Sequence, residues 1–209
     1  MKLAVICANG KAGQCITREA VSRGLDVTAV VRGENRSAAK NAVLKDLFAL
    51  TPADLQGYDA VVDAFGAWTP ETIPQITDAV RKLCDVLADS KTRLLIVGGA
   101  GSLYVDPEHT LTVADGPDFP AAWKPLAKAH GAALDHLRTV RNVDWTYISP
   151  AGDFRADGER TGSYQLGGEE LLLNARGESV ISYADYAIAV VDEIVKGSHI
   201  RQRISVVSE

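Results

Sequence analysis

After Met1 the chain reads Lys2-Leu3-Ala4-Val5-Ile6-Cys7-Ala8-Asn9-Gly10-Lys11-Ala12-Gly13, and the expected architecture starts from this stretch. The run from Lys2 to Cys7 is short and apolar, as in a parallel strand that is buried on both faces. A turn with two glycines follows it. Apolar residues then recur at helical spacing until Gly24, which stands where a helix C-cap glycine belongs. The order is therefore strand, glycine turn, helix.

The same alternation continues to the end of the chain. The sequence predicts strands at 2–7, 26–31, 42–47, 59–64, 93–97 and 144–149, helices at 69–90, 121–140 and 186–195, and an edge strand at 202–207. Strands separated by helices indicate right-handed βαβ units. We therefore expect an α/β protein: one Rossmann domain over residues 1–209, with a doubly wound parallel sheet and helices on both faces.

Two long segments lack helical or strand periodicity. Residues 98–120 are rich in Gly, Asp and Pro, and residues 150–168 form a second polar stretch. Loops of this length inside a compact domain usually carry function. We expect these two loops to form a substrate pocket.

Composition excludes several classes of protein. The 209 residues are 46% hydrophobic and 23% charged, with a net charge of −5 and no basic cluster, so nucleic acid is not an expected partner. No apolar run approaches the ~20 residues of a membrane span. The three cysteines form no CxxC pair, which argues against a disulfide framework or a metal site. We expect a cytoplasmic protein without a membrane partner.

The first glycine turn is suited to a phosphate. Free backbone N–H groups and the dipole at a helix N-terminus attract an anion, provided that the backbone can approach it closely. The turn Ala8-Asn9-Gly10-Lys11-Ala12-Gly13 lies between the first strand and the first helix and supplies this geometry. Its position favours dinucleotide binding. The alternative is a tight connection without a ligand.

The end of the second strand predicts which nucleotide binds. An NAD site places an acidic residue there for the ribose 2′-hydroxyl, whereas an NADP site places a cation for the 2′-phosphate. Here the strand ends in Val30-Val31-Arg32, with Arg36 close behind. We therefore expect NADP as the cofactor, with NADPH preferred over NADH. An ordinary surface role for Arg32 is the alternative.

Several segments together resemble a known family. These are the glycine turn, Asp46-Leu47, Ala64-Phe65-Gly66, Gly98-Gly99-Ala100-Gly101-Ser102, and Trp145-Thr146-Tyr147-Ile148-Ser149-Pro150-Ala151-Gly152. The chain resembles the atypical short-chain dehydrogenase/reductases along its full length. Within that group it is most similar to the NmrA-like NADH-flavin reductases, and more distantly to the biliverdin/flavin reductases.

The resemblance implies a role for each segment. Residues 8–13 would hold the pyrophosphate and Arg32 the 2′-phosphate. Asp46 and Leu47 would flank the adenine, and Ala64, Phe65 and Gly66 would cover the ribose. Ser149, Pro150 and Ala151 would approach the nicotinamide. The first glycine of the family motif is Cys7 here, and we expect strand-like dihedral angles at that position.

The expected reaction follows from an absent motif. Orthodox short-chain enzymes protonate a carbonyl substrate from a tyrosine that has a lysine four residues on. None of the six tyrosines of this chain has such a lysine. A flavin needs less help, because it accepts hydride at a ring nitrogen and delocalises the charge. We expect an NAD(P)H-dependent oxidoreductase that passes hydride to a small planar acceptor, a flavin such as FMN or FAD or a quinone-like molecule.

Two polar residues are candidates for catalysis. Ser102 follows the glycine-rich end of the strand at 93–97, where its hydroxyl would face the nicotinamide or the acceptor. His130 lies on the helix at 121–140, near the position of the catalytic lysine in orthodox relatives. A turn-forming serine and a structural histidine are the alternatives. A second class of function stays open, a redox sensor that binds NADP(H) without turnover. The oligomeric state cannot be read from the sequence.

Overall fold

The central sheet of the computed structural model, which describes residues 1–209, has eight strands in the order β3-β2-β1-β4-β5-β6-β10-β8. Its strands are β1 Lys2–Ile6, β2 Asp26–Val31, β3 Asn41–Leu44, β4 Ala60–Asp63, β5 Arg93–Val97, β6 Trp145–Ser149, β8 Gln165–Gly167 and β10 Gln202–Val207. All neighbours in this sheet are parallel except β10 and β8. A separate pair of short strands joins β7 Asp153–Arg155 to β9 Val180–Ser182.

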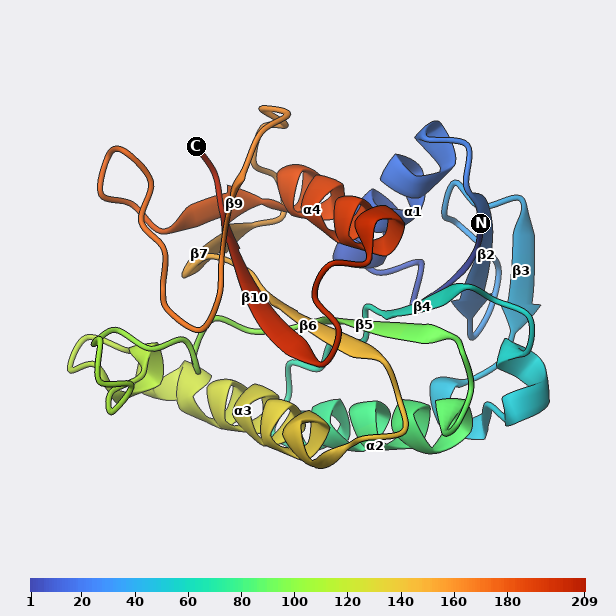
Figure 1. Cartoon of the computed structure of the whole chain (residues 1–209), viewed down its shortest axis with the longest axis horizontal. Coiled ribbons are helices and arrows are strands. Elements are labelled where there is room, and N and C mark those ends of the chain that lie inside the picture. The colour runs from blue at the N-terminus through green and yellow to red at the C-terminus, as the bar shows by residue number, and fades with distance from the viewer.

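Two helices cover each face of the sheet. Helices α1 (Lys11–Ser22) and α4 (Tyr183–Lys196) pack together on one face, and α2 (Gln75–Leu87) and α3 (Lys124–Thr139) pack on the other (Figure 1). The expected doubly wound Rossmann architecture is therefore confirmed. None of these helices combines the length and the apolar character that a membrane crossing requires.

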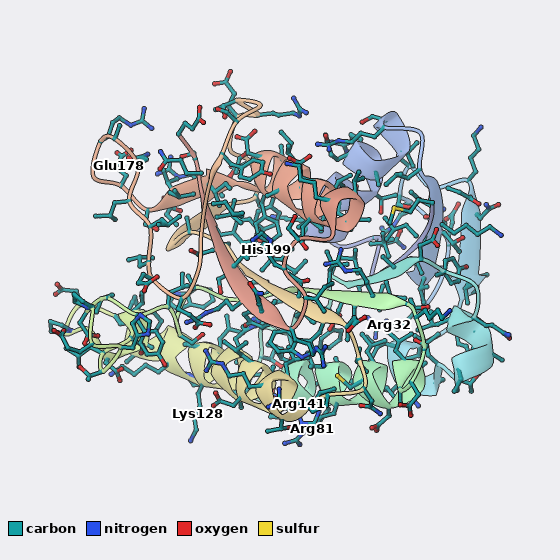
Figure 2. All side chains as sticks on the ribbon, viewed as in Figure 1. Arg32, Arg81, Lys128, Arg141, Glu178 and His199 are labelled. Carbon is teal, nitrogen blue, oxygen red and sulfur yellow. The ribbon has the colours of Figure 1, made fainter.

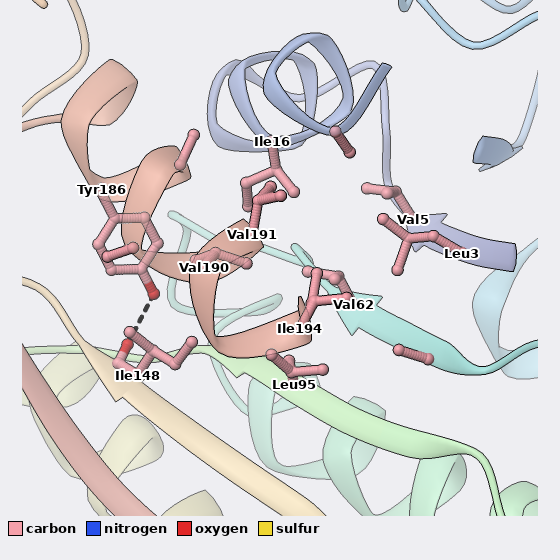
Figure 3. Packing of buried hydrophobic residues seen from close by; sticks show 14 of the residues in the cluster. Leu3, Val5, Ile16, Val62, Leu95, Ile148, Tyr186, Val190, Val191 and Ile194 are labelled. Carbon is pink, nitrogen blue, oxygen red and sulfur yellow. Dashed lines mark hydrogen bonds between the residues drawn. The ribbon is translucent and has the colours of Figure 1, made fainter. Parts of the chain in front are cut away.

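The strands read as continuous apolar runs because both of their faces are buried. In β1, Leu3 and Val5 belong to the core on the α1/α4 side, whereas Ala4 and Ile6 belong to the core on the α2/α3 side. Figure 3 shows the first core, with Ile16 of α1 directly above Val191 of α4 and with Leu3 and Val5 of β1 to the right. In the same core the buried Tyr186 hydroxyl donates to the Ile148 carbonyl at 2.7 Å, which ties α4 to β6.

The sheet order creates a crevice at one edge. The chain runs from β1 to β2 on one side and returns to β4 on the other, so the connections that leave the carboxyl ends of β1 and β4 diverge. Ligands of open α/β sheets bind in the crevice outside the carboxyl ends of the strands at such a switch point. The segments that follow β1, β2, β4 and β5 are therefore brought to one place.

Several predicted elements need correction. The strand at 202–207 forms as predicted but is not an edge, because β10 pairs with both β6 and β8. The predicted loop at 150–168 contains β7 and β8. Their three-residue lengths give no alternation to detect, and only pairing with distant segments orders them.

Helix boundaries also differ from the predictions. Helix α2 begins at Gln75 rather than near residue 69, because residues 70–73 form turns and Pro74 is the N-cap. Helix α3 begins at Lys124, after a short 3₁₀ turn at Ala121–Trp123. Helix α4 begins at Tyr183, where the Ser182 hydroxyl accepts a hydrogen bond from the Asp185 amide at 3.0 Å.

Candidate functional site

A cavity of about 1140 Å³ opens at the carboxyl ends of β1, β2, β4 and β5. This volume exceeds the usual range of ligand pockets, about 300 to 1,000 Å³. Many residues singled out from the sequence line it: Asn9, Gly10, Lys11, Ala12, Arg32, Asp46, Leu47, Ala64, Phe65, Gly66 and His130.

The N-terminus of α1 offers free hydrogen-bond donors to this cavity. No side chain caps the helix, and its first backbone bond runs from the Gln14 amide to the Gly10 carbonyl at 2.8 Å. The amides of Lys11, Ala12 and Gly13 therefore have no acceptor within the chain. Such amides, together with the helix dipole, bind phosphate groups. The arrangement fits the pyrophosphate of a dinucleotide.

The two glycines of the turn serve different purposes. A Cβ at Gly13 would lie 2.5 Å from the Cys7 carbonyl oxygen and 2.9 Å from the Ala8 Cα, so this glycine lets α1 pack closely on the end of β1. A Cβ at Gly10 would lie 3.2 Å from the same oxygen, and Gly10 itself lines the cavity. Ala8 and Gly13 are buried behind the cavity surface.

The backbone at Cys7 differs from the expectation. Its φ is +59°, in the left-handed region, so the prediction of strand-like dihedrals was wrong. The Cys7 amide donates to Val30 at 2.9 Å and its carbonyl accepts from the Gly10 amide at 2.9 Å. These two bonds impose the sharp turn even though the residue has a Cβ. Burial raises the pKa of the Cys7 thiol to about 12, which leaves it protonated and weakly nucleophilic.

The segment after β2 presents unpaired positive charge. Arg32 and Arg36 are exposed, line the cavity and form no ion pair within the chain. Asn9 fixes this segment, because its side-chain Nδ2 donates to the Glu34 carbonyl at 2.8 Å and its side-chain Oδ1 accepts from the Arg36 amide at 2.7 Å. These two bonds connect the glycine turn (residues 8–13) to the segment that carries Arg32 and Arg36. The two arginines are therefore positioned to bind an additional phosphate group.

The segments expected to hold the adenosine part also meet here. The Asp46 carboxylate accepts from the Phe48 amide at 2.9 Å and caps a short 3₁₀ turn that begins at Leu47. The rings of Phe48 and Phe65 pack edge to face with centroids 6.0 Å apart. Phe48 and Phe65 both line the cavity and form part of an aromatic wall.

Beneath the cavity lies a carboxyl group that the sequence did not single out. Asp63, the last residue of β4, is 3% exposed, and its carboxyl accepts from the Phe65 amide at 3.0 Å. Burial raises the pKa of Asp63 to about 7, because ionisation of the enclosed carboxyl is costly. The only sequence signal was an acidic residue at the end of an otherwise apolar strand.

His130 reaches the cavity from α3 and is packed against Tyr147. The Tyr147 hydroxyl accepts from the Gly99 amide at 3.0 Å and lies 3.3 Å from the His130 carbonyl and 3.4 Å from its Nδ1. A Cβ at Gly98 would lie 2.3 Å from the Tyr147 ring, so the glycines after β5 make room for this tyrosine. Burial lowers the pKa of His130 to about 4 and raises that of Tyr147 to about 12. Both side chains are uncharged at neutral pH.

The other predicted residues lie away from the cavity surface. The Ser102 hydroxyl accepts from Arg203 Nη1 at 3.1 Å, and Ser102 does not line the cavity. Ser149, Pro150 and Ala151 are buried and do not line it either. Ser102 was predicted from the strand end that it follows, and Ser149, Pro150 and Ala151 from the family resemblance. Neither specifies the direction of a side chain.

The two loops expected to form the pocket contribute less than predicted. From residues 98–120 only Gly98 lines the cavity, and from residues 150–168 only Phe154 and Ala156 do. Phe154 packs against Tyr183, which also lines the cavity, with ring centroids 4.0 Å apart. Lys128, on the same helix as His130, is exposed and points away from the sheet (Figure 2).

Comparison with known proteins gives a consistent result. A family model for NAD(P)H-binding proteins matches residues 7–194. The uncharacterized protein YwnB of Bacillus subtilis strain 168 is 46% identical over 212 residues, covering 100% of this chain and 99% of that protein. A crystal structure from Streptococcus pneumoniae TIGR4, of a protein provisionally named an NADH-flavin reductase, is 55% identical with a TM-score of 0.98 and full coverage of both chains.

A further crystal structure shares the fold at lower identity. The protein is from Burkholderia pseudomallei and is provisionally named an exported protein. It is 37% identical, with a TM-score of 0.87 and 99% coverage of each chain. The match to the family model extends from the phosphate turn to helix α4, and the cavity at the switch point has the donors that a dinucleotide needs. The chain belongs to the NAD(P)H-binding family, with a Rossmann-like fold and a nicotinamide nucleotide as its cofactor.

Proposed function

We propose that the protein is an NADPH-dependent oxidoreductase that transfers hydride to a flavin. The observation that carries the proposal is the composition of the cavity. Two unpaired arginines line it after β2, several aromatic side chains line it elsewhere, and His130, which also lines it, is neutral at pH 7. Bound NADPH would supply the hydride. The protein would bind it, orient it and exclude water from the transfer.

The choice of a flavin rests on proton chemistry. Reduction of a carbonyl creates an alkoxide that needs an acid nearby. His130 is neutral at pH 7, and the Tyr147 hydroxyl is buried and engaged with the Gly99 amide. A flavin spreads the negative charge over its own ring system and requires only positioning. The name of the pneumococcal relative supports the same class of acceptor.

The reaction is tested by steady-state oxidation of NADPH with FMN as the acceptor. We expect turnover by the parent protein, and an unchanged rate for Ser102→Ala, because that hydroxyl is bonded to Arg203 outside the cavity. Tight binding of NADPH without oxidation by FMN, FAD or a quinone would contradict the enzyme and favour a redox sensor. A rate loss of several hundredfold in Ser102→Ala would show that the proton chemistry had been assigned wrongly.

Cofactor preference gives a second test. Arg32→Ala is expected to lose about 1 to 3 kcal/mol of binding free energy toward NADPH, the range for hydrogen bonds to charged groups, and almost none toward NADH. Calorimetric titration with both nucleotides measures the difference. Arg81→Ala is a matched control, because Arg81 is exposed on α2 and does not line the cavity. Equal affinity of the parent for NADPH and NADH would refute the role of Arg32.

A further inference from the structure

The rim of the cavity carries two exposed tryptophans from different parts of the chain. The side chain of Trp68, in the segment after β4, is 66% exposed, and that of Trp123, at the start of α3, is 49% exposed. Their rings pack edge to face, with centroids 6.2 Å apart and planes 88° apart. The third tryptophan of the chain, Trp145, is 3% exposed in the core. Exposed aromatic surface at the edge of a cavity is characteristic of a binding site.

We infer that Trp68 is the surface on which the planar ring of the acceptor stacks, and that Trp123 holds it in position. This inference rests on the proposed function and names the residues that recognise the acceptor. Trp68 lines the cavity, whereas Trp123 does not and contacts Trp68 from outside. Trp68 is therefore the residue that a bound molecule can reach.

The chain fixes the position of Trp68 from two sides. The preceding residue, Ala67, is 4% exposed and anchors the segment in the core. The indole lies next to Gly66, where an added Cβ would be 3.7 Å from the ring. Trp123 is fixed in turn, because its amide donates to the Pro120 carbonyl at 2.9 Å immediately before α3 begins. The edge-to-face contact therefore joins two anchored segments.

The aromatic contacts of Trp68 differ from those of the residues expected to hold adenosine. There, Phe48 packs against Phe65, and both line the cavity together with Asp46. Trp68 instead lies beside α3, whose Leu126 and His130 line the cavity together with it. A large apolar ring there offers contact area and a π face but no charge. This chemistry fits an uncharged, planar heteroaromatic ring such as the isoalloxazine of a flavin.

The test uses binding, so that it does not depend on turnover. FMN is titrated calorimetrically into the protein loaded with NADP⁺. We expect Trp68→Ala to raise the Kd for FMN about tenfold, Trp68→Phe to restore most of the affinity, and the Kd for NADPH to change less than twofold. Trp123→Ala is expected to raise the Kd for FMN by about threefold, because its role is indirect. Val105→Ala, which removes an exposed apolar side chain outside the cavity, is the control.

The outcomes separate this inference from the proposed function. An unchanged Kd for FMN in Trp68→Ala, or no binding of FMN by the parent, overturns the stacking role. If the parent oxidises NADPH with FMN while Trp68→Ala binds FMN normally, the proposed function stands and the inference fails. An equal loss of NADPH affinity in Trp68→Ala would place Trp68 in the cofactor site and also overturn it. Unchanged thermal unfolding of the variants shows that each is folded.

Discussion

Gly13→Ala is expected to destabilise the protein by about 2 to 3 kcal/mol, although alanine favours helices more than glycine does. The added Cβ would lie 2.5 Å from the Cys7 carbonyl oxygen and 2.9 Å from the Ala8 Cα. Both are backbone atoms at the end of a central strand, so they cannot rotate away as a side chain can. Helix α1 must instead move off β1, which loosens its packing and shifts the amides that face the phosphate.

Urea unfolding followed by tryptophan fluorescence measures this change, with calorimetry for NADPH. Gly131→Ala is the matched control: the same substitution within a helix, where the nearest atom to the new Cβ is 3.9 Å away. It is expected to stabilise the protein by up to about 1 kcal/mol through helix propensity. Equal effects of the two substitutions would show that α1 does not depend on the close approach at Gly13.

Asp63→Asn is expected to make the protein more stable than the parent at pH 8, by up to about 4 kcal/mol, with the difference fading near pH 4. Burial raises the pKa of Asp63 to about 7 in the folded state, from about 3.8 in the unfolded chain. The folded state therefore holds the proton more tightly. The free energy of unfolding is therefore highest below about pH 4, where the carboxyl is protonated in both states. It falls as the pH rises toward 7, by about 1.4 kcal/mol for each pH unit, because the folded state must then hold a proton or a buried charge.

Asparagine keeps an acceptor for the Phe65 amide and cannot ionise, so it removes the titration. The free energy of unfolding of parent and variant is measured by urea denaturation between pH 4 and 9. Asp85→Asn, on the exposed face of α2, is the control and is expected to follow the parent at every pH. A constant difference between Asp63→Asn and the parent across this range would disprove the raised pKa.

The cofactor side of the cavity was largely predictable from the sequence. Asn9, Gly10, Lys11, Ala12 and Arg32 follow β1 and β2 directly, and all of them line the cavity. The reason is local: parallel strands end at one edge of the sheet, so the few residues after each strand must lie there. For residues 9–12 the two glycines of the turn, and for Arg32 its place directly after β2, were enough to predict a position at the cavity.

The acceptor side was not predictable in the same way. Ser102 is five residues beyond β5, yet its carbonyl and hydroxyl oxygens accept hydrogen bonds from Arg203 of β10 outside the cavity. Trp68 and Trp123 are 55 positions apart in the chain and meet only because α3 packs beside the segment after β4. Such contacts depend on the paths of the long loops between strands and helices. The periodicity of hydrophobic residues does not predict these paths.

Sequence reasoning was sufficient to predict the alternation of buried strands and helices, the glycine turn and the positive charge after β2. Each of these three features depends on residues that are close together in the sequence: the spacing of hydrophobic residues, the glycines of the turn and the arginines after the strand. Three features arise from the folded chain: the left-handed backbone of Cys7, the inner position of β10 and the raised pKa of Asp63. These depend on hydrogen bonds, strand pairing and desolvation supplied by distant segments, so they exist only once the sheet is assembled.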